Sequence, residues 1–140
     1  MATFGTAKWQ GGLKDGKGAI STKSGALTDY PYGFASRFEG KPGTNPEELI
    51  GGAHAGCFTM ALSLILEQAG FKAEEMNTRA EITLTKQGDG FAITKSQLTL
   101  RAKIPGIDDA KFRELAGMAE KGCPVSKVLN CEIVLDAALV

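Results

Sequence analysis

The sequence predicts an α+β fold in which antiparallel strands pack around one long, buried central helix. Two observations predict this class. Short stretches of alternating apolar and polar residues lie near both ends of the chain, and a nearly uncharged helical run lies between them. The length of 140 residues, with 43% hydrophobic and 23% charged residues, is typical of one soluble globular domain. We therefore expect residues 1–140 to form a single domain.

The first forty residues are rich in glycine and alternate over short distances. Stretches such as Gly18–Ser24 and Gly33–Glu39 are typical of short strands joined by turns. We expect strands and turns throughout this region.

The long helix is predicted to begin within segment 44–48. That segment offers a capping side chain, a proline for the first helical position and two glutamates for the positive helix end. Helical character continues to Gly70, and from Ala53 to Leu66 the helix is apolar nearly all round, so we expect burial on most sides. Because one chain offers few strands to cover such a helix, we expect a homodimer with this helix near the interface.

The second half predicts an antiparallel hairpin followed by two helices and a strand. Thr78–Lys86 and Phe91–Ile104 alternate on either side of a Gly-Asp-Gly turn, and a switch of inward parity indicates a bulge near Lys95 to Gln97. The next helix should start after the capping residue Asp108 and end at Gly122. A short third helix should start at Pro124, and a final strand should run from Cys131 to Leu139.

The charge balance and the lack of targeting signals argue against several classes of partner and location. Sixteen basic and sixteen acidic residues cancel, so no strong field would attract nucleic acid or an anionic membrane. The N-terminus does not resemble a signal peptide, and we expect the longest uncharged apolar stretch to be well short of the ~20 residues of a membrane span. Three cysteines, an odd number, argue against a secreted disulfide scaffold. We expect a cytoplasmic protein with neither nucleic acid nor membrane as a partner.

The cysteines are the residues most suited to chemistry. Cys57 lies in the apolar helix, where an inert buried thiol is the commoner case. Cys123 lies between a glycine and a proline at a helix N-cap, where free backbone N–H groups favour a thiolate. The two are too far apart for a Cys-x-x-Cys motif. Cys131 lies on the same face of its predicted strand as apolar neighbours, so we expect it to be an unreactive core residue.

Charged neighbours are less specific. Arg37, beside Phe38, is a candidate for stabilising a thiolate, although a surface arginine is commoner. His54 lies three residues before Cys57 on the same helix face. One histidine and three dispersed cysteines do not form a spaced ligand set, so we expect no metal. Nucleotide-binding glycine loops and a Gly-x-Ser-x-Gly motif are absent from the sequence.

Several motifs together resemble the OsmC branch of the OsmC/Ohr family. They are PYGFASRFEG at 31–40, GTNPEELI at 43–50, AHAGCF at 53–58, FAITK at 91–95 and GCPVS at 122–126. The resemblance covers nearly the whole chain. It implies an OsmC-like fold that forms an intertwined homodimer with active sites at the subunit interface.

The resemblance also implies an activity. Members are thiol-dependent peroxidases that reduce organic hydroperoxides to alcohols without a cofactor. By motif, Cys57 would be the peroxidatic cysteine, oxidised to a sulfenic acid, and Cys123 the resolving cysteine that forms a disulfide with it. Arg37 would activate the thiol and Glu47 would hold Arg37. A small-molecule or protein-bound dithiol would restore both thiols.

Helix geometry conflicts with part of this assignment. Ten residues separate Glu47 from Cys57, about 15 Å along a straight helix, so one guanidinium could hardly touch both. Either the helix breaks at Gly51-Gly52, or Glu47 only caps the helix. Three other functions stay open: a thiol hydrolase using Cys57 and His54, a non-enzymatic thiol redox sensor, and a dimer that binds apolar ligands.

Overall fold

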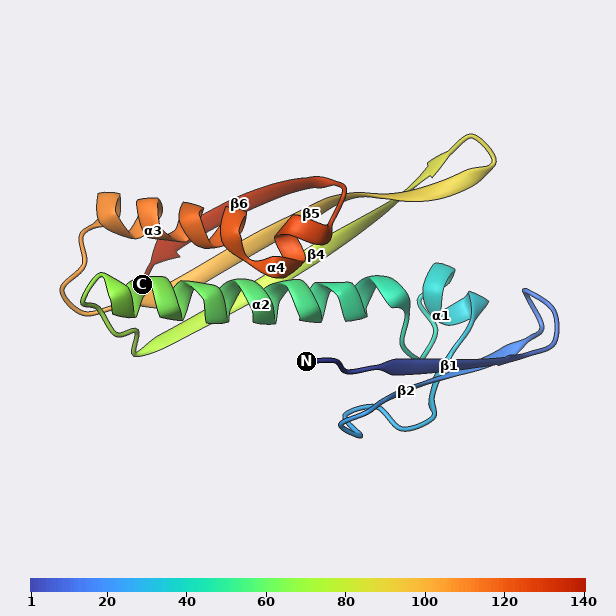
Figure 1. Ribbon diagram of the computed structural model, residues 1–140. Coiled ribbons are helices and arrows are strands. Elements are labelled where there is room, and N and C mark those ends of the chain that lie inside the picture. The colour runs from blue at the N-terminus through green and yellow to red at the C-terminus, as the bar shows by residue number, and fades with distance from the viewer. The chain divides into compact units, whose positions relative to one another are not determined.

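The computed structural model describes all of residues 1–140 and contains six strands and four helices (Figure 1). The chain divides into two compact units, Met1–Leu49 and Ile50–Val140. The long helix α2 (Pro46–Gln68) begins in the first unit and continues into the second. The mixture of separate sheets and helices confirms the predicted α+β class.

The first unit holds a small antiparallel sheet and a short helix. Strands β1 (Gly5–Gln10), β2 (Lys17–Thr22) and β3 (Tyr30–Tyr32) pair in that order. The prediction of a strand-like stretch at Gly33–Glu39 is wrong, because Phe34–Phe38 forms helix α1.

Local contacts explain why α1 is helical. Phe34 and Phe38 are four residues apart, which places them on one helix face, and their ring centroids lie 5.0 Å apart. At the start of the helix, the N–H of Gly33 donates a 2.9 Å hydrogen bond to Ser36 Oγ. The pair of aromatic residues at positions i and i+4 indicates a helix, but the alternation of apolar and polar residues in this stretch favoured a strand.

Helix α2 starts as predicted but does not break. The N–H of Glu48 donates to Asn45 Oδ1 at 2.8 Å, so Asn45 is a capping residue. The helix then runs unbroken through Gly51 and Gly52, and the predicted alternative of a break there is wrong. A Cβ on Gly51 would lie 2.8 Å from the carbonyl oxygen of Ala80, so this glycine lets the helix pack closely against a strand.

The second unit contains a mixed three-stranded sheet. Strands β4 (Glu75–Gln87) and β5 (Gly90–Lys103) form the predicted antiparallel hairpin, whose tip projects beyond the helices of this unit (Figure 1). The pairing shifts so that Thr94 is the extra residue, one position before the range predicted for the bulge. Strand β6 (Glu132–Leu139) is parallel to β5, which corrects the expectation of antiparallel strands throughout.

The connection between β5 and β6 explains their parallel pairing. Helices α3 (Asp109–Gly122) and α4 (Pro124–Val128) carry the chain back before β6 begins, as a crossover between parallel strands requires. Asp108 caps α3 by accepting from the N–H of Lys111 at 2.7 Å, which confirms the predicted start.

One face of α2 packs into the core of the second unit and the other is exposed. The buried stripe of α2 comprises Phe58, Leu62 and Leu66, which lie in one cluster with residues of β5 and α3. Met60 and Leu64 are 76% and 55% exposed, so the expectation of burial on most sides is wrong for a single chain. Contrary to the sequence expectation, α2 is long and apolar enough to cross a membrane, a test that core helices of soluble proteins also pass.

Candidate active site

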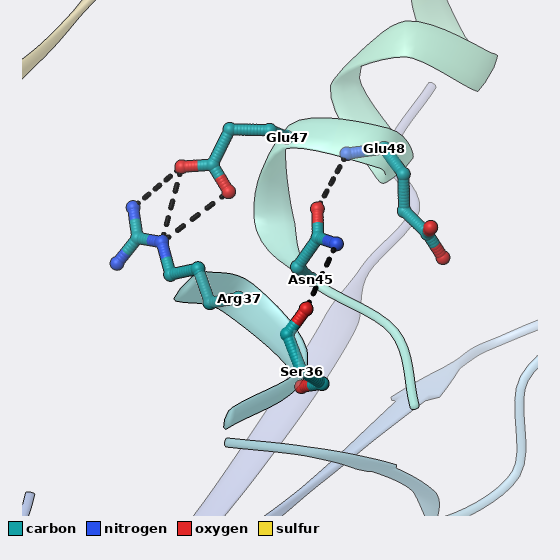
Figure 2. Close-up of polar contacts among 5 residues, drawn as sticks. All are labelled: Ser36, Arg37, Asn45, Glu47 and Glu48. Atoms are coloured by element: carbon teal, nitrogen blue, oxygen red, sulfur yellow. Dashed lines mark hydrogen bonds and ion pairs between the residues drawn. The ribbon is translucent and has the colours of Figure 1, made fainter. Parts of the chain in front are cut away.

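An ion pair joins Arg37 of α1 to Glu47 in the first turn of α2 (Figure 2). Arg37 Nη2 lies 2.6 Å from Glu47 Oε1, and Arg37 Nε donates to both carboxylate oxygens, at 3.1 and 3.3 Å. The arginine side chain is 37% exposed and that of the glutamate 10%. This two-nitrogen contact fixes the orientation of the guanidinium more firmly than a single bond would.

The segment before α2 is tied to α1, which brings the two charged residues together. Ser36 Oγ donates to the carbonyl oxygen of Thr44 at 2.8 Å. Asn45 Nδ2 donates to the carbonyl oxygen of Ser36 at 3.5 Å (Figure 2). Gly43 adopts φ +127°, and a Cβ there would lie 2.9 Å from the carbonyl oxygen of Pro31. The neighbouring motifs therefore build one charged site.

The Arg37–Glu47 ion pair bears on the two alternatives that the sequence left for Glu47, a broken helix or a role as helix cap only. Glu47 does more than cap the helix, since it binds Arg37. Because α2 is unbroken, Glu47 and Cys57 are nevertheless separated by about 15 Å along the same helix axis. Both alternatives, a broken helix and a glutamate that only caps, are therefore wrong.

The second unit brings the two predicted thiols together. The Cys57 thiol is half-buried, and the Cys123 side chain and the backbone of Val125 are neighbours that influence its ionisation. Burial raises the pKa of Cys57, the Cys123 thiol raises it further, and the Val125 backbone contact lowers it. The two cysteines are free, not disulfide-bonded, in this structure.

Cys123 is the N-cap of α4, as predicted. The N–H of Ser126 donates to Cys123 Sγ at 3.2 Å, and Cys123 Sγ donates to Ser126 Oγ at 3.1 Å. Cys123 is fully buried. These contacts fix the position of the Cys123 sulfur at the start of α4.

His54 is fully buried and bound at both ring nitrogens. Nδ1 lies 2.6 Å from Ser96 Oγ and Nε2 lies 2.8 Å from Ser126 Oγ. Burial lowers the pKa of His54, so the neutral imidazole is favoured. Sequence reasoning missed both serines, although Ser96 has the inward parity of Leu98 and Ser126 is the third residue after the capping cysteine.

The third cysteine lies apart from these contacts. Cys131 precedes β6 and is half-buried outside the hydrophobic core, so its predicted core position is wrong. No group of three or more His, Cys, Asp or Glu side chains in the structure could hold a metal ion.

Comparisons with known proteins identify the family. Residues 38–137 match the family described as OsmC-like protein. The chain is 54% identical over 135 residues to peroxiredoxin OsmC of Escherichia coli strain K12, covering 96% of this chain and 94% of that protein. It is 31% identical over 140 residues to organic hydroperoxide resistance protein OhrB of Bacillus subtilis, covering 97% and 98%. The crystal structure of OhrB aligns with a TM-score of 0.74 at 27% identity, covering 96% of this chain and 98% of that one. The chain belongs to the OsmC-like protein family.

Proposed function

We propose that the protein is a cysteine-based peroxidase that reduces organic hydroperoxides to alcohols. The names of its relatives, a peroxiredoxin and organic hydroperoxide resistance proteins, support a peroxidase role. The observation that carries the mechanism is the proximity of the Cys57 and Cys123 thiols within one chain. The reaction needs no cofactor, because the reductant is external.

The proposed cycle has three steps. The Cys57 thiolate attacks a peroxide oxygen, the O–O bond breaks, and the departing alkoxide takes up a proton to become the alcohol. Cys57 is left as a sulfenic acid. Cys123 then attacks the Cys57 sulfur, forming a disulfide and releasing water. An external dithiol, small or protein-bound, reduces the disulfide by thiol–disulfide exchange.

The first step requires positive charge near Cys57, because burial and the Cys123 thiol oppose ionisation. We assign this role to Arg37, held in orientation by Glu47. Since α2 is unbroken, a guanidinium bound to Glu47 does not reach Cys57 of the same helix. The partner subunit's Arg37 would therefore serve each Cys57.

The exposed face of α2 supports a homodimer. Met60 and Leu64 are apolar side chains left largely exposed on a helix whose opposite face packs into the core. Covering them with a second copy would remove apolar surface from water. We propose that residues 1–140 act as one family domain in a cytoplasmic homodimer.

Peroxide consumption tests the function directly. With cumene hydroperoxide and a dithiol, the wild-type protein should turn over many times, and a monothiol should support turnover less well. Cys57→Ser should abolish turnover, because a hydroxyl does not replace a thiolate. Cys131→Ser is the matched control and should retain activity. Oxidation of the wild type once per chain without turnover would favour a redox sensor, and activity in Cys57→Ser would exclude this mechanism.

His54 weakens the hydrolase alternative. Both of its ring nitrogens contact serines, at 2.6 and 2.8 Å. A thiol hydrolase would instead need one nitrogen to take the proton from Cys57 directly. The thiol pair and the histidine contacts therefore support a redox role over hydrolysis.

A further inference from the structure

A continuous chain of polar contacts leads from the thiol pair into the core of the second unit. Cys123 is a neighbour of Cys57. Cys123 Sγ lies 3.1 Å from Ser126 Oγ, and Ser126 Oγ lies 2.8 Å from His54 Nε2. His54 Nδ1 ends the chain on Ser96 Oγ at 2.6 Å. Cys123, His54 and Ser96 are fully buried and Ser126 is 8% exposed, so water has little access to these groups.

The contacts provide a route for proton movement from Cys123 toward His54. When Cys123 S–H donates to Ser126 Oγ, the serine oxygen is the acceptor, and its single hydroxyl proton stays available for donation. His54 Nε2, at 2.8 Å, accepts that proton when the ring carries its own proton on Nδ1. Nδ1–H then donates to Ser96 Oγ, so a ring protonated at Nδ1 is compatible with every contact. Burial lowers the pKa of His54 and keeps the ring neutral, so that one ring nitrogen has a free lone pair.

We propose that His54, acting through the Ser126 hydroxyl, accepts the Cys123 proton and so activates Cys123 for disulfide formation with Cys57. Ser126 touches the reacting sulfur, whereas His54 is a positioning residue that acts through it. The inference rests on the proposed function, because the Cys57 sulfenic acid formed in that reaction is the group that the Cys123 sulfur attacks.

The step balances in atoms and electrons. The Cys123 proton passes to Ser126 Oγ as the serine proton passes to His54 Nε2. The Cys123 sulfur supplies the electron pair of the new S–S bond, and the Cys57 S–O bond breaks with its pair leaving on hydroxide. The proton on His54 passes back to Ser126 Oγ, and the Ser126 hydroxyl delivers a proton to the departing hydroxide, which becomes water. The products are one disulfide and one water.

A chromogenic disulfide tests Cys123 without a peroxide. In a Cys131→Ser background, 5,5′-dithiobis(2-nitrobenzoate) should react first at Cys57, releasing one thionitrobenzoate. Cys123 should then attack the mixed disulfide and release a second. The second phase therefore reports the nucleophilicity of Cys123, and Cys123→Ser should show the first phase alone.

Two variants break the relay in different ways. His54→Gln keeps hydrogen-bonding capacity but does not take up a proton, and Ser126→Ala removes the hydroxyl while keeping the backbone N–H at Cys123. Each should slow the second phase by at least about ten-fold, a conservative limit below the roughly 10²–10⁴-fold typical of acid–base catalysis, and leave the first phase within about two-fold. Thr59→Val, which removes a hydroxyl on α2 bonded to Thr78 at 2.6 Å, is the matched control and should change neither phase.

A second readout separates proton transfer from packing. The deficit of both variants should shrink as the solution becomes more alkaline, because hydroxide removes the Cys123 proton without the relay. Packing damage would persist at every pH. Circular dichroism checks the fold, and Ser126→Ala carries the test if His54→Gln does not fold.

The outcomes are distinct. A second phase unchanged in both variants, or a deficit that does not respond to pH, would overturn the relay. Release of a single thionitrobenzoate by the parent protein would overturn it as well, since Cys123 would not reach Cys57. A slowed second phase in a protein that does not turn over hydroperoxide would support the relay and reject the proposed function.

Discussion

Cys57 is the residue at which the chemistry and the local electrostatics conflict. Burial and the neighbouring Cys123 thiol raise its pKa, and the backbone of Val125 lowers it. A peroxidatic cysteine reacts as the thiolate, so its reactivity at neutral pH depends on added positive charge. The oriented guanidinium of Arg37 is the group that we assign to this role.

Removal of that charge should appear in the pH profile of Cys57 alkylation. Arg37→Met should raise the apparent pKa of the thiol and slow peroxide attack at neutral pH, because the cation favours the ionised form. Glu47→Gln should act in the same direction but more weakly, by releasing the guanidinium. Arg79→Met, from an exposed ion pair with Glu81, is the control. Unshifted profiles in Arg37→Met and Glu47→Gln would remove both residues from the site.

His54 should leave a signature in the pH dependence of stability. It is the only histidine, and burial lowers its pKa below the ordinary value of 6.5. Below pH 6.5 the unfolded state therefore binds more protons than the folded state, and the free energy of unfolding falls as the pH falls. Urea unfolding at several pH values should show this slope in wild type and a flatter one in His54→Gln. Equal slopes would mean that His54 titrates alike in both states.

At the scale of secondary structure, local chemistry made several elements predictable. The capping side chains of Asn45 and Asp108 and the prolines that follow Asn45 and Cys123 define helix starts within a few residues of sequence. The thiol pair and the Arg37–Glu47 pair were found through motifs, because each residue alone has a commoner structural role. Ser96 and Ser126 were missed, since their role depends on a histidine far away in the sequence.

Elements that depend on distant contacts were harder to predict. Helix α1 has five residues, too few for a helical period to emerge from the sequence. The direction of β6 depends on its crossover and on pairing with β5, neither of which its own alternation encodes. Continuity of α2 through two glycines also depends on tertiary packing, which outweighs a penalty of about 1 kcal/mol per glycine.

The two glycines of α2 should respond oppositely to alanine. Nothing lies within 4 Å of a Cβ built on Gly52, whereas one on Gly51 would lie 2.8 Å from the carbonyl oxygen of Ala80. Gly52→Ala should therefore raise the free energy of unfolding by roughly 0.5–1 kcal/mol, and Gly51→Ala should lower it. Urea unfolding at one protein concentration measures both. Stabilisation by Gly51→Ala would mean that α2 does not pack closely on β4.

At the scale of the whole molecule, the exposed side of α2 is the feature to explain. Met60 and Leu64 lie on this side, while Phe58 is fully buried on the other. We therefore expect light scattering at low micromolar concentration to give about twice the chain mass of 14.7 kDa. Leu64→Glu should weaken the dimer, and Met118→Glu on α3, also at an exposed apolar residue, should not. A stable wild-type monomer would contradict the proposal.

Mixed dimers test whether the partner subunit supplies Arg37. Cys57→Ser and Arg37→Met homodimers should each be inactive or slow. Exchange of subunits should restore activity, because a mixed dimer pairs an intact Cys57 of one chain with an intact Arg37 of the other. If both residues acted within one chain, mixing would restore nothing.

The central claim is that an organic hydroperoxide is reduced by Cys57 and leaves a disulfide to Cys123. Reduced protein treated with less than one equivalent of cumene hydroperoxide tests it, with the alcohol, the free thiols and the tryptic peptides all quantified. The predicted result is two thiols lost for each alcohol formed and one dominant Cys57–Cys123 peptide within a single subunit. Alcohol without thiol loss, a dominant bond to Cys131, or bonds only between subunits would contradict it.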